Sequence, residues 1–586
     1  MRPSLLSLLL SLLFTNLGTA QTDLFGIVNQ YAAVLDIDPC LNSLRLDQVT
    51  GFQTGDRVLL IQMQGAQISS GDNADFGTVT DLGRTGFHEK GTIASIAGEE
   101  IFLENALLHD YDINGRVQLV RIASHASARI TAPLLGQPWN GQTGGIIALE
   151  IENTLEILSS GTIDATGIGF RGGTAVSNLP NNCTWVIQQN DYYYSFDSWR
   201  AAAKGEGIAA YIPNREAGKG PQANGGGGGN DHNSGGGGGA LFSRGGEGGT
   251  NREPSLFGCQ GDHPGLGGRA LPDDPAGRRL YLGGGGGAGH GNNNRSSNGG
   301  NGGGIILVQA QQLLIAPGTT TVIRTNGADA LGAQGDGGGG GGAAGHCVLD
   351  VMDFNIGGDL RMEALGGNGA SVDNLNRDRC HGPGGAGSGG VIDMPELMPP
   401  PAGFELLVGG GDPGVSRNSS ACPDSRTAAQ AGSSGSRTDR INIAEGTTPS
   451  EALSIVSQPQ AQIACEGDRV SFDLLATGTD LSYVWEADSG SGFQPLSDGG
   501  NISGSQSATL IIDPVTLTQD GLQLRASVSN ACFGALPTQV VSLQVLPSPL
   551  AQFTALTSGS TITLTNTSTN ATTYSWDFGD GQSSTD

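Results

Sequence analysis

Two pairs of metal-ligating residues are the first candidates for chemistry, His346-Cys347 and Cys380-His381. Two thiolates and two imidazoles can close a tetrahedral zinc site. Neither pair has the usual Cys-x-x-Cys spacing, and the thiols of an exported protein become oxidised. We therefore expect a disulfide between Cys347 and Cys380 with the histidines beside it, and a zinc site is the alternative.

Acidic residues offer two further chemistries, proton transfer and calcium binding. Asp164, Glu206 and Asp336 could transfer protons, but nothing in the sequence fixes the short separation of two catalytic carboxylates, so we expect surface acids. The clusters 72–75 and 577–580 contain few carboxylates, whereas calcium takes six to eight oxygens, and neither cluster is an EF-hand. We expect solvated acids and no cofactor, with calcium as the alternative.

Stacking on sugar rings is the third chemistry, because one short segment holds much of the small aromatic content of the chain. Its rings can bind the apolar faces of a glycan. Alternatively, they cover the neighbouring glycine-rich layer and are held there by a disulfide between Cys183 and Cys259. The aromatic segment is defined by Trp185, Tyr192, Tyr193, Tyr194, Phe196 and Trp199, and all but Phe196 are our candidate ligand-binding residues.

Four motifs of catalysis or nucleotide binding are absent from the sequence. They are the His-Glu-x-x-His helix, the Gly-x-Ser-x-Gly elbow, the phosphate loop and the dinucleotide fingerprint between strand and helix. We predict no catalytic residues and a protein that is not an enzyme.

The chain that must position these residues is rich in glycine. Glycine accounts for 99 of its 586 residues, about 17% against a usual value of roughly 7%. The net charge of −27 is opposite to that of nucleic-acid-binding proteins and excludes that class. The glycines occur in blocks rather than at every third position, which excludes collagen. Apolar residues cluster into strand-like runs, so the chain can bury a core.

Residues 1–20 have the pattern of a secretory signal peptide: a charged start, an apolar run over residues 5–14 and small residues before the cleavage site. The run is shorter than the roughly 20 residues of a spanning helix, which leaves an uncleaved anchor as the weaker alternative. We expect a secreted or cell-surface protein with no membrane span after cleavage. Export makes its eight cysteines candidates for disulfides.

Short strands and turns predict a small β-sandwich or barrel-like cap over residues 21–135. Residues 136–398 form a glycine-rich repeat region, in which the stretch 144–167 resembles 303–327. Degenerate copies are predicted to start at Gly357 and Gly389. Stacking such units buries faces that one unit cannot bury alone, which predicts a mostly β protein with a β-solenoid-like body.

Four blocks of consecutive glycines accompany the repeat, and they are either flexible loops or packed strands of polyproline-II type. Loops would avoid the large entropy loss of ordering glycine. Packed strands would use N–H···O and Cα–H···O contacts that only glycine permits. We favour packing, because the blocks recur and contain few of the charges typical of linkers. The blocks are residues 225–229, 235–239, 283–287 and 337–342.

Residues 399–454 are predicted to be a partly extended linker. The stretches Cys465–Phe472, Tyr483–Trp485, Thr509–Ile512 and Asp520–Ala526 follow, and residues 455–547 resemble a bacterial immunoglobulin-like domain.

In such a domain Trp485 is the buried strand tryptophan. Leu474 and Ala526 stand where the inter-sheet disulfide would be. The resemblance therefore implies an apolar core at that point and a displaced bridge between Cys465 and Cys532.

Residues 548–586 resemble the first part of a polycystic-kidney-disease (PKD) domain, through the Trp-Asp-Phe-Gly-Asp-Gly motif at 576–581. The sequence stops before the second half of that domain. We therefore expect the sequence to be a fragment of a longer protein.

The front of the chain, residues 27–395, resembles the glycine-rich region of large surface proteins from Bacteroidetes-type bacteria, which include gliding-motility-associated adhesins. The motifs that support the resemblance are 56–66, 117–121, 139–141, 169–173, 203–208 and 232–236. It implies a non-enzymatic protein of adhesion or extracellular matrix, whose partners are a surface, a glycan or a matrix component. The alternative is a carbohydrate-binding or polysaccharide-degrading protein whose catalytic domain lies beyond residue 586.

Overall fold

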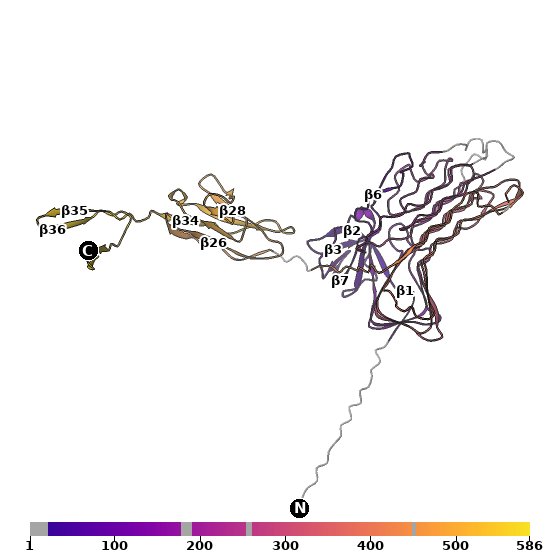
Figure 1. The fold of residues 1–586 in the computed structure, drawn as a ribbon, viewed down its shortest axis with the longest axis horizontal. Coiled ribbons are helices and arrows are strands. Elements are labelled where there is room, and N and C mark those ends of the chain that lie inside the picture. Colours follow the sequence, from indigo (N-terminus) through magenta and orange to yellow (C-terminus); the bar gives the residue numbers. More distant parts are fainter. Residues whose placement is uncertain (1–20, 177–189, 253–260, 423, 448–452, 586) are drawn as a thin grey trace, which may run out of the picture. The chain divides into compact units, whose positions relative to one another are not determined.

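The computed structural model describes residues 21–176, 190–252, 261–422, 424–447 and 453–585. The chain forms two compact units, Met1–Thr447 and Thr448–Asp586 (Figure 1). The described residues are almost entirely β and irregular structure, with short 3-10 turns at Ile113–Gly115 and Leu517–Gln519 and no α-helix. In this part of the chain, no helix has the length and apolar character to cross a membrane.

Six antiparallel strands near the start of the chain close into a barrel. These strands lie within residues 21–135, where the sequence predicts short strands and turns. Its core is aliphatic, with Leu44, Leu60 and Leu119 almost fully buried. The strands are β2 (Gln30–Asp38), β3 (Ser43–Leu46), β4 (Arg57–Gln62), β7 (His88–Ala97), β8 (Glu100–Leu103) and β9 (Val117–Arg121), and β5 (Gln67–Ile68) pairs with β6 (Val79–Asp81) outside it.

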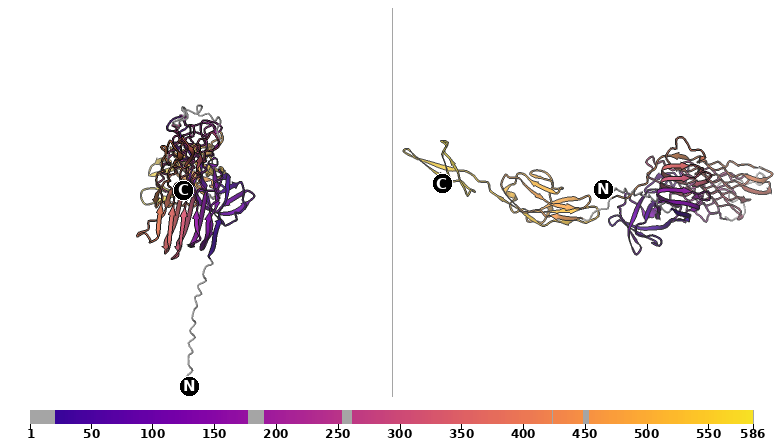
Figure 2. Two further views of the ribbon diagram at one scale, coloured as in Figure 1. Left: turned by 90° about the vertical axis from the view of Figure 1, so that its right-hand side faces the viewer. Right: turned by 90° about the horizontal axis from the view of Figure 1, so that it is seen from below.

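The largest sheet has twelve parallel strands, of which all but the first follow the barrel in sequence, and its strands lie side by side in Figure 2. A second, three-stranded sheet contains β16 (Ala333–Gln334), β19 (Val372–Arg377) and β22 (Ser416–Ser419). The large sheet consists of β1 (Thr22–Ile27), β10 (Ala123–His125), β11 (Ala128–Leu135), β12 (Ile146–Ile157), β13 (Thr162–Asp164), β14 (Ile305–Ile315), β15 (Thr320–Arg324), β17 (His346–Ile356), β18 (Asp359–Glu363), β20 (Val391–Asp393), β21 (Phe404–Leu407) and β23 (Ser436–Thr438).

The register of this sheet follows the sequence repeat. Ile146 of β12 lies beside Ile305 of β14, which confirms the match between the two clear copies. The degenerate copy after Gly389 is also confirmed, because Val391 pairs with His346. The copy predicted at Gly357 is wrong, since residues 359–363 form β18 and pair with β15, a later strand of the unit. The third unit begins instead at β17, where only one glycine precedes the strand.

Both faces of the sheet are buried, as its continuous apolar runs require. Ile147 and Leu149 contribute to one core, and Ile146 and Ala148 contribute to the other. Successive side chains of a strand point to opposite faces, so one strand serves two cores.

The glycine blocks form neither helix nor regular strand, yet they are packed and hydrogen-bonded to one another. Gly300 N–H donates to Gly340 O at 2.8 Å, and Gly340 N–H donates to Gly287 O at 2.8 Å. The predicted packing of these blocks is therefore confirmed.

The predicted linker at residues 399–454 is wrong over most of its length. Its strands β21 and β23 pair with β18 and β20 in the large sheet, and β22 pairs with β19. Lys90 N–H of the barrel then donates to Ala444 O at 2.8 Å. Most side chains of this stretch are half-buried or exposed, but its backbone is hydrogen-bonded to the sheets, so it is part of the first unit and not a linker.

In the second unit, a six-stranded sheet and a three-stranded sheet share one core. Trp485 is fully buried, its indole N–H donates to Ser507 O at 2.9 Å, and Leu474 and Ala526 are buried as predicted. The strands are β24 (Ser454–Ser457), β25 (Gln462–Cys465), β26 (Val470–Asp473), β27 (Leu475–Thr477), β28 (Ser482–Asp488), β29 (Gln494–Pro495), β30 (Ile502–Ser503), β31 (Thr509–Ile512), β32 (Gln523–Ser529), β33 (Leu536–Pro537) and β34 (Val541–Leu546), followed by the hairpins of β35 (Phe553–Ser558) with β36 (Thr561–Asn566) and β37 (Trp576–Asp577) with β38 (Ser583–Ser584).

The predicted Cys465–Cys532 bridge is wrong, because Cys465 is a free thiol. Cys465 pairs with Leu546 at the end of β34, whereas Cys532 lies in the turn between β32 and β33. These positions are at opposite ends of the sheet, so the two side chains cannot meet.

Candidate functional site

The aromatic segment lies on the surface of the first unit, where its described tyrosines and Trp199 are half-buried and Phe196 is exposed. Backbone hydrogen bonds hold it in place: Tyr192 N–H donates to Asp72 Oδ1 at 2.6 Å and Tyr194 N–H donates to Ala217 O at 2.9 Å. Trp185 and the predicted Cys183–Cys259 bridge lie outside the described residues.

Cations lie over the rings of three of these aromatic residues, and they decide which rings a ligand could reach. Lys219 Nζ is 4.4 Å from the ring centroid of Tyr192. The guanidinium of Arg215 is 4.3 Å from that of Tyr193, and the guanidinium of Arg200 is 4.8 Å from that of Trp199. A sugar that stacked on the same faces would displace these cation–π contacts.

Phe196 is the member of the segment that borders an open cavity, with a volume of about 260 Å³. Arg171, Lys204, Tyr211 and Glu216 also line this cavity, which we call the aromatic cavity. Tyr211 Oη donates to Lys204 O at 3.0 Å, so the phenol is fixed in position. The cavity therefore combines two aromatic rings with charged groups of both signs, a combination suited to a hydroxyl-rich ligand.

Glu206 supports the base of the aromatic cavity through Arg171. Its carboxylate accepts from Arg171 Nε at 3.0 Å and from the indole N–H of Trp139 at 3.1 Å. Glu206 is buried, and the prediction that it is a surface acid is wrong. The reason is that an arginine and an indole, both distant in sequence, satisfy the buried charge.

The other two candidate acids, Asp164 and Asp336, also accept hydrogen bonds from neighbouring groups. Asp164 is partly buried and its Oδ2 accepts from Arg324 Nη2 at 2.6 Å. Asp336 is fully buried, which corrects its placement on the surface, and burial raises its pKa to about 6. Backbone N–H groups of Asn293 and Arg295 donate to its carboxylate.

Lys204 is buried beside the aromatic cavity, with Nζ 3.7 Å from the ring centroid of Phe76. Burial lowers its pKa well below the usual value, and the charge of Arg215 adds to that effect. The amine therefore loses its proton more readily than an exposed lysine does.

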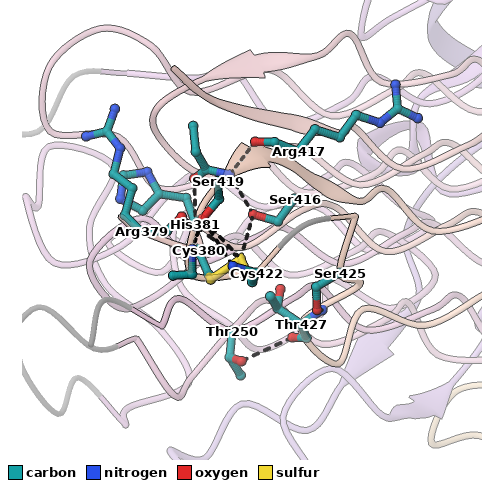
Figure 3. The surroundings of a disulfide bond; sticks show 12 residues. Thr250, Arg379, Cys380, His381, Ser416, Arg417, Ser419, Cys422, Ser425 and Thr427 are labelled. Atoms are coloured by element: carbon teal, nitrogen blue, oxygen red, sulfur yellow. Dashed lines mark hydrogen bonds between the residues drawn. A yellow bond between two sulfur atoms is a disulfide. The ribbon is translucent and has the colours of Figure 1, made fainter. Parts of the chain in front are cut away.

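The predicted Cys347–Cys380 disulfide is wrong, because Cys380 bonds Cys422 instead (Figure 3). Cys347 is a buried free thiol whose side chain packs in the core of the large sheet. The glycine-rich run 382–390 lies between Cys380 and Ile392, the strand partner of Cys347. The two cysteines are therefore at different ends of the body.

The zinc alternative for the same residues is not supported either. His346 and Cys347 are neighbours on β17 and point to opposite faces, and the thiol of Cys380 is in a disulfide. In the described parts of the chain, no three His, Cys, Asp or Glu side chains are grouped to hold a metal. In the cluster 72–75, Asp72 accepts from Tyr192 N–H and Asn73 from Asp75 N–H.

We expect the Cys380–Cys422 disulfide to stabilise the first unit substantially. It closes a loop with a sequence separation of 42 residues, for which chain entropy gives about 4 kcal/mol. The double substitution Cys380→Ser with Cys422→Ser should lower the free energy of urea unfolding by about that amount. Cys465→Ser, which removes a free and half-buried thiol, is the control and should leave it unchanged. Equal unfolding midpoints for the double variant and the wild type would contradict the prediction.

No protein-family model and no curated protein matches the chain. Solved immunoglobulin-domain structures match a short part of it. A titin M10–obscurin-like 1 Ig complex covers 17% of this chain and 97% of its own at 18% identity and TM-score 0.14. The titin M3 domain covers 16% and 95% at 28% identity and TM-score 0.14. The Ig1-2 module of the Drosophila receptor protein tyrosine phosphatase DLAR covers 17% and 56% at 19% identity and TM-score 0.15. TM-scores this low carry no functional argument.

Proposed function

We propose that this chain is a non-enzymatic, modular protein of the cell surface or extracellular matrix, exported by the signal peptide at residues 1–20. In this proposal the barrel is a cap on a solenoid-like glycine-rich body, and an immunoglobulin-like module and the start of a PKD module follow. The proposal takes from the sequence its resemblance to gliding-motility-associated adhesins of Bacteroidetes type. The supporting observation is the aromatic cavity, which a tightly hydrogen-bonded body presents at its surface.

Adhesion is favoured over a purely structural role by the position of Phe196. This ring is 48% exposed at the edge of a cavity whose other walls are ordered by hydrogen bonds. A large exposed aromatic beside fixed polar groups is typical of a binding surface. An acidic surface of net charge −27 keeps such a protein soluble outside the cell, and several weak modules on one chain gain avidity.

The second candidate function is carbohydrate binding in the service of polysaccharide degradation, with a catalytic domain beyond residue 586. The same cavity supports it, because Phe196 and Tyr211 border a space lined by Arg171 and Glu216. A glycan ligand is therefore common to both candidates.

We expect the full chain to bind a glycan through the aromatic cavity, and Phe196→Ala to weaken that binding about tenfold, the loss of one aromatic contact. The measurement is a glycan array followed by titration of the best ligand. Phe25→Ala is the matched control, because Phe25 is 62% exposed on β1 and does not line the cavity. Absence of glycan binding, or equal affinity of the Phe196 variant, would contradict this function.

A further inference from the structure

A second cavity, of about 340 Å³, lies in the first unit at the edge of the large sheet, and we call it the edge cavity. The last strands of the sheet, β20 and β23, form one wall, and the loop at residues 273–279 forms another. Its polar lining includes His346, Asp393, Ser436, Thr438, Asp273 and Arg440.

The strand register shows that these polar residues replace apolar ones. Ile305 of β14 is followed along its row by His346, Val391 and Ser436. Two residues further along the strands, and therefore on the same face, Leu307 is followed by Val348, Asp393 and Thr438. Elsewhere this face is an apolar core. The change to polar side chains is found where the strands border the edge cavity.

His346 and Asp393 form a buried pair in the wall of the cavity. His346 Nε2 is 2.6 Å from Asp393 Oδ2, and the hydroxyl of Thr438 donates to Asp393 Oδ1. Burial raises the pKa of Asp393, but the hydrogen bonds from His346 and Thr438 and the charge of Arg440 act together against burial, so the pKa lies below its usual value. The carboxylate is therefore ionised and assigns the imidazole hydrogen to Nε2.

The other imidazole nitrogen has no partner. His346 is 3% exposed, and its Nδ1 has no hydrogen-bond partner in the described part of the chain. A buried polar nitrogen without a hydrogen-bond partner costs about 1 to 3 kcal/mol, so the position favours a ligand hydroxyl, which can donate or accept. The ring of Phe242, which also lines the cavity, lies edge-on to the imidazole at 6.0 Å and supplies an apolar wall.

The charges of the cavity already have partners, which disfavours an ionic ligand. Asp273 pairs with Arg440, Asp274 pairs with Arg278, and Asp393 accepts from His346 and Thr438. An anion would face three carboxylates, and a cation would face Arg440 and Arg279. Hydrogen-bonding capacity remains at His346 Nδ1 and at the exposed hydroxyl of Ser436.

We propose that the edge cavity binds a neutral, hydroxyl-rich small molecule such as a single sugar residue, with one hydroxyl hydrogen-bonded to His346 Nδ1 and another bonded to Ser436. The cavity volume is in the range of small-molecule sites. The site is separate from the aromatic cavity and does not depend on the function proposed for it.

The test is calorimetric titration of the full chain with methyl glycosides of glucose, galactose and mannose, with inorganic phosphate and calcium chloride as ionic probes. We expect one of the glycosides to bind, and Ser436→Ala to weaken that binding about tenfold, the loss of one hydrogen bond. His346→Phe, which keeps the ring and removes Nδ1, should abolish it. Because this variant leaves Asp393 with a single partner and can fail to fold, the exposed Ser436 variant provides the independent test.

Two controls locate the binding. Ser434→Ala changes an exposed serine outside the cavity and should leave the affinity unchanged, as should Phe196→Ala in the aromatic cavity. Binding of phosphate or calcium alone, absence of any glycoside binding, or equal affinity of the wild type and the Ser436 variant would each overturn the proposal. Loss of binding in the Phe196 variant alone would overturn it too, and would support the aromatic cavity instead.

Discussion

Replacing Gly340 by alanine is expected to prevent folding of the glycine-rich body. A Cβ at this position would lie 2.1 Å from Gly237 O and 2.3 Å from Gly237 C, far inside any real contact. Both atoms are backbone, so no side chain can move aside. The backbone of Gly340 is itself hydrogen-bonded to Gly287 and Gly300. We expect a destabilisation of at least about 4 kcal/mol, the range reached by severe overpacking and strain.

The matched control is Gly409→Ala, in the same unit. The nearest atom to a Cβ there is Leu365 Cδ2 at 3.5 Å, an ordinary van der Waals contact. The measurement is thermal unfolding of both full-chain variants, with amide hydrogen exchange across the glycine blocks. We expect protected amides in the wild type and in the Gly409 variant and their loss in the Gly340 variant. A Gly340 variant that melts with the wild type would refute the packed arrangement.

The sequence was sufficient to predict the packing of the glycine blocks but not which blocks pair. Their recurrence and low charge indicate order. Pairing depends on contacts such as Gly340 with Gly237 and Gly287, and identical residues carry no signal that distinguishes one partner from another. The apolar runs at Ile146 and Ile305 could be aligned because their side chains repeat. The third unit begins with the polar residue His346, so it could not be recognised as a copy from the sequence.

The cysteine pairings failed for a related reason. The bridge between Cys347 and Cys380 was predicted from the oxidation of thiols in an exported protein, but the repeat places the two cysteines at different ends of the body. Trp485 was predicted correctly because its neighbourhood is local, two sheets enclosing a single core. His346 and Asp393 are adjacent only through the pairing of β17 with β20, which no spacing in the sequence reveals.

The first unit is expected to lose stability in acid because two of its histidines are buried without charge. Burial lowers the pKa of His88 and of His290 from 6.5 to about 4. His290 Nδ1 accepts from Asn233 N–H, while Nε2–H donates to Trp199 O, so the site accommodates a neutral ring. As the pH falls from 6.5 to 4, the unfolded chain binds a proton at each histidine that the folded chain does not. The loss is about 3 kcal/mol for each residue.

Asp336 has the opposite effect on stability and offsets part of the loss caused by the two histidines. Its pKa is raised from 3.8 to about 6, so the folded state takes up its proton first and gains about 3 kcal/mol as the pH falls through this window. The net loss for the three groups is then about 3 kcal/mol, to which the lowered pKa values of Asp164 and Asp393 add at the acid end. Urea unfolding at several pH values between 6.5 and 4 measures the total.

Two substitutions should move this pH dependence in opposite directions. His290→Gln keeps a donor and an acceptor and removes one titrating group, so the loss between pH 6.5 and 4 should shrink by about 3 kcal/mol. Asp336→Asn removes the opposing group and should enlarge the loss by a similar amount. In each variant the substituted residue no longer binds a proton, so it no longer contributes to the difference in bound protons between the folded and unfolded states. Parallel curves of unfolding free energy against pH for the wild type and both variants would contradict the prediction. They would show that the pKa values of His290 and Asp336 do not change on folding.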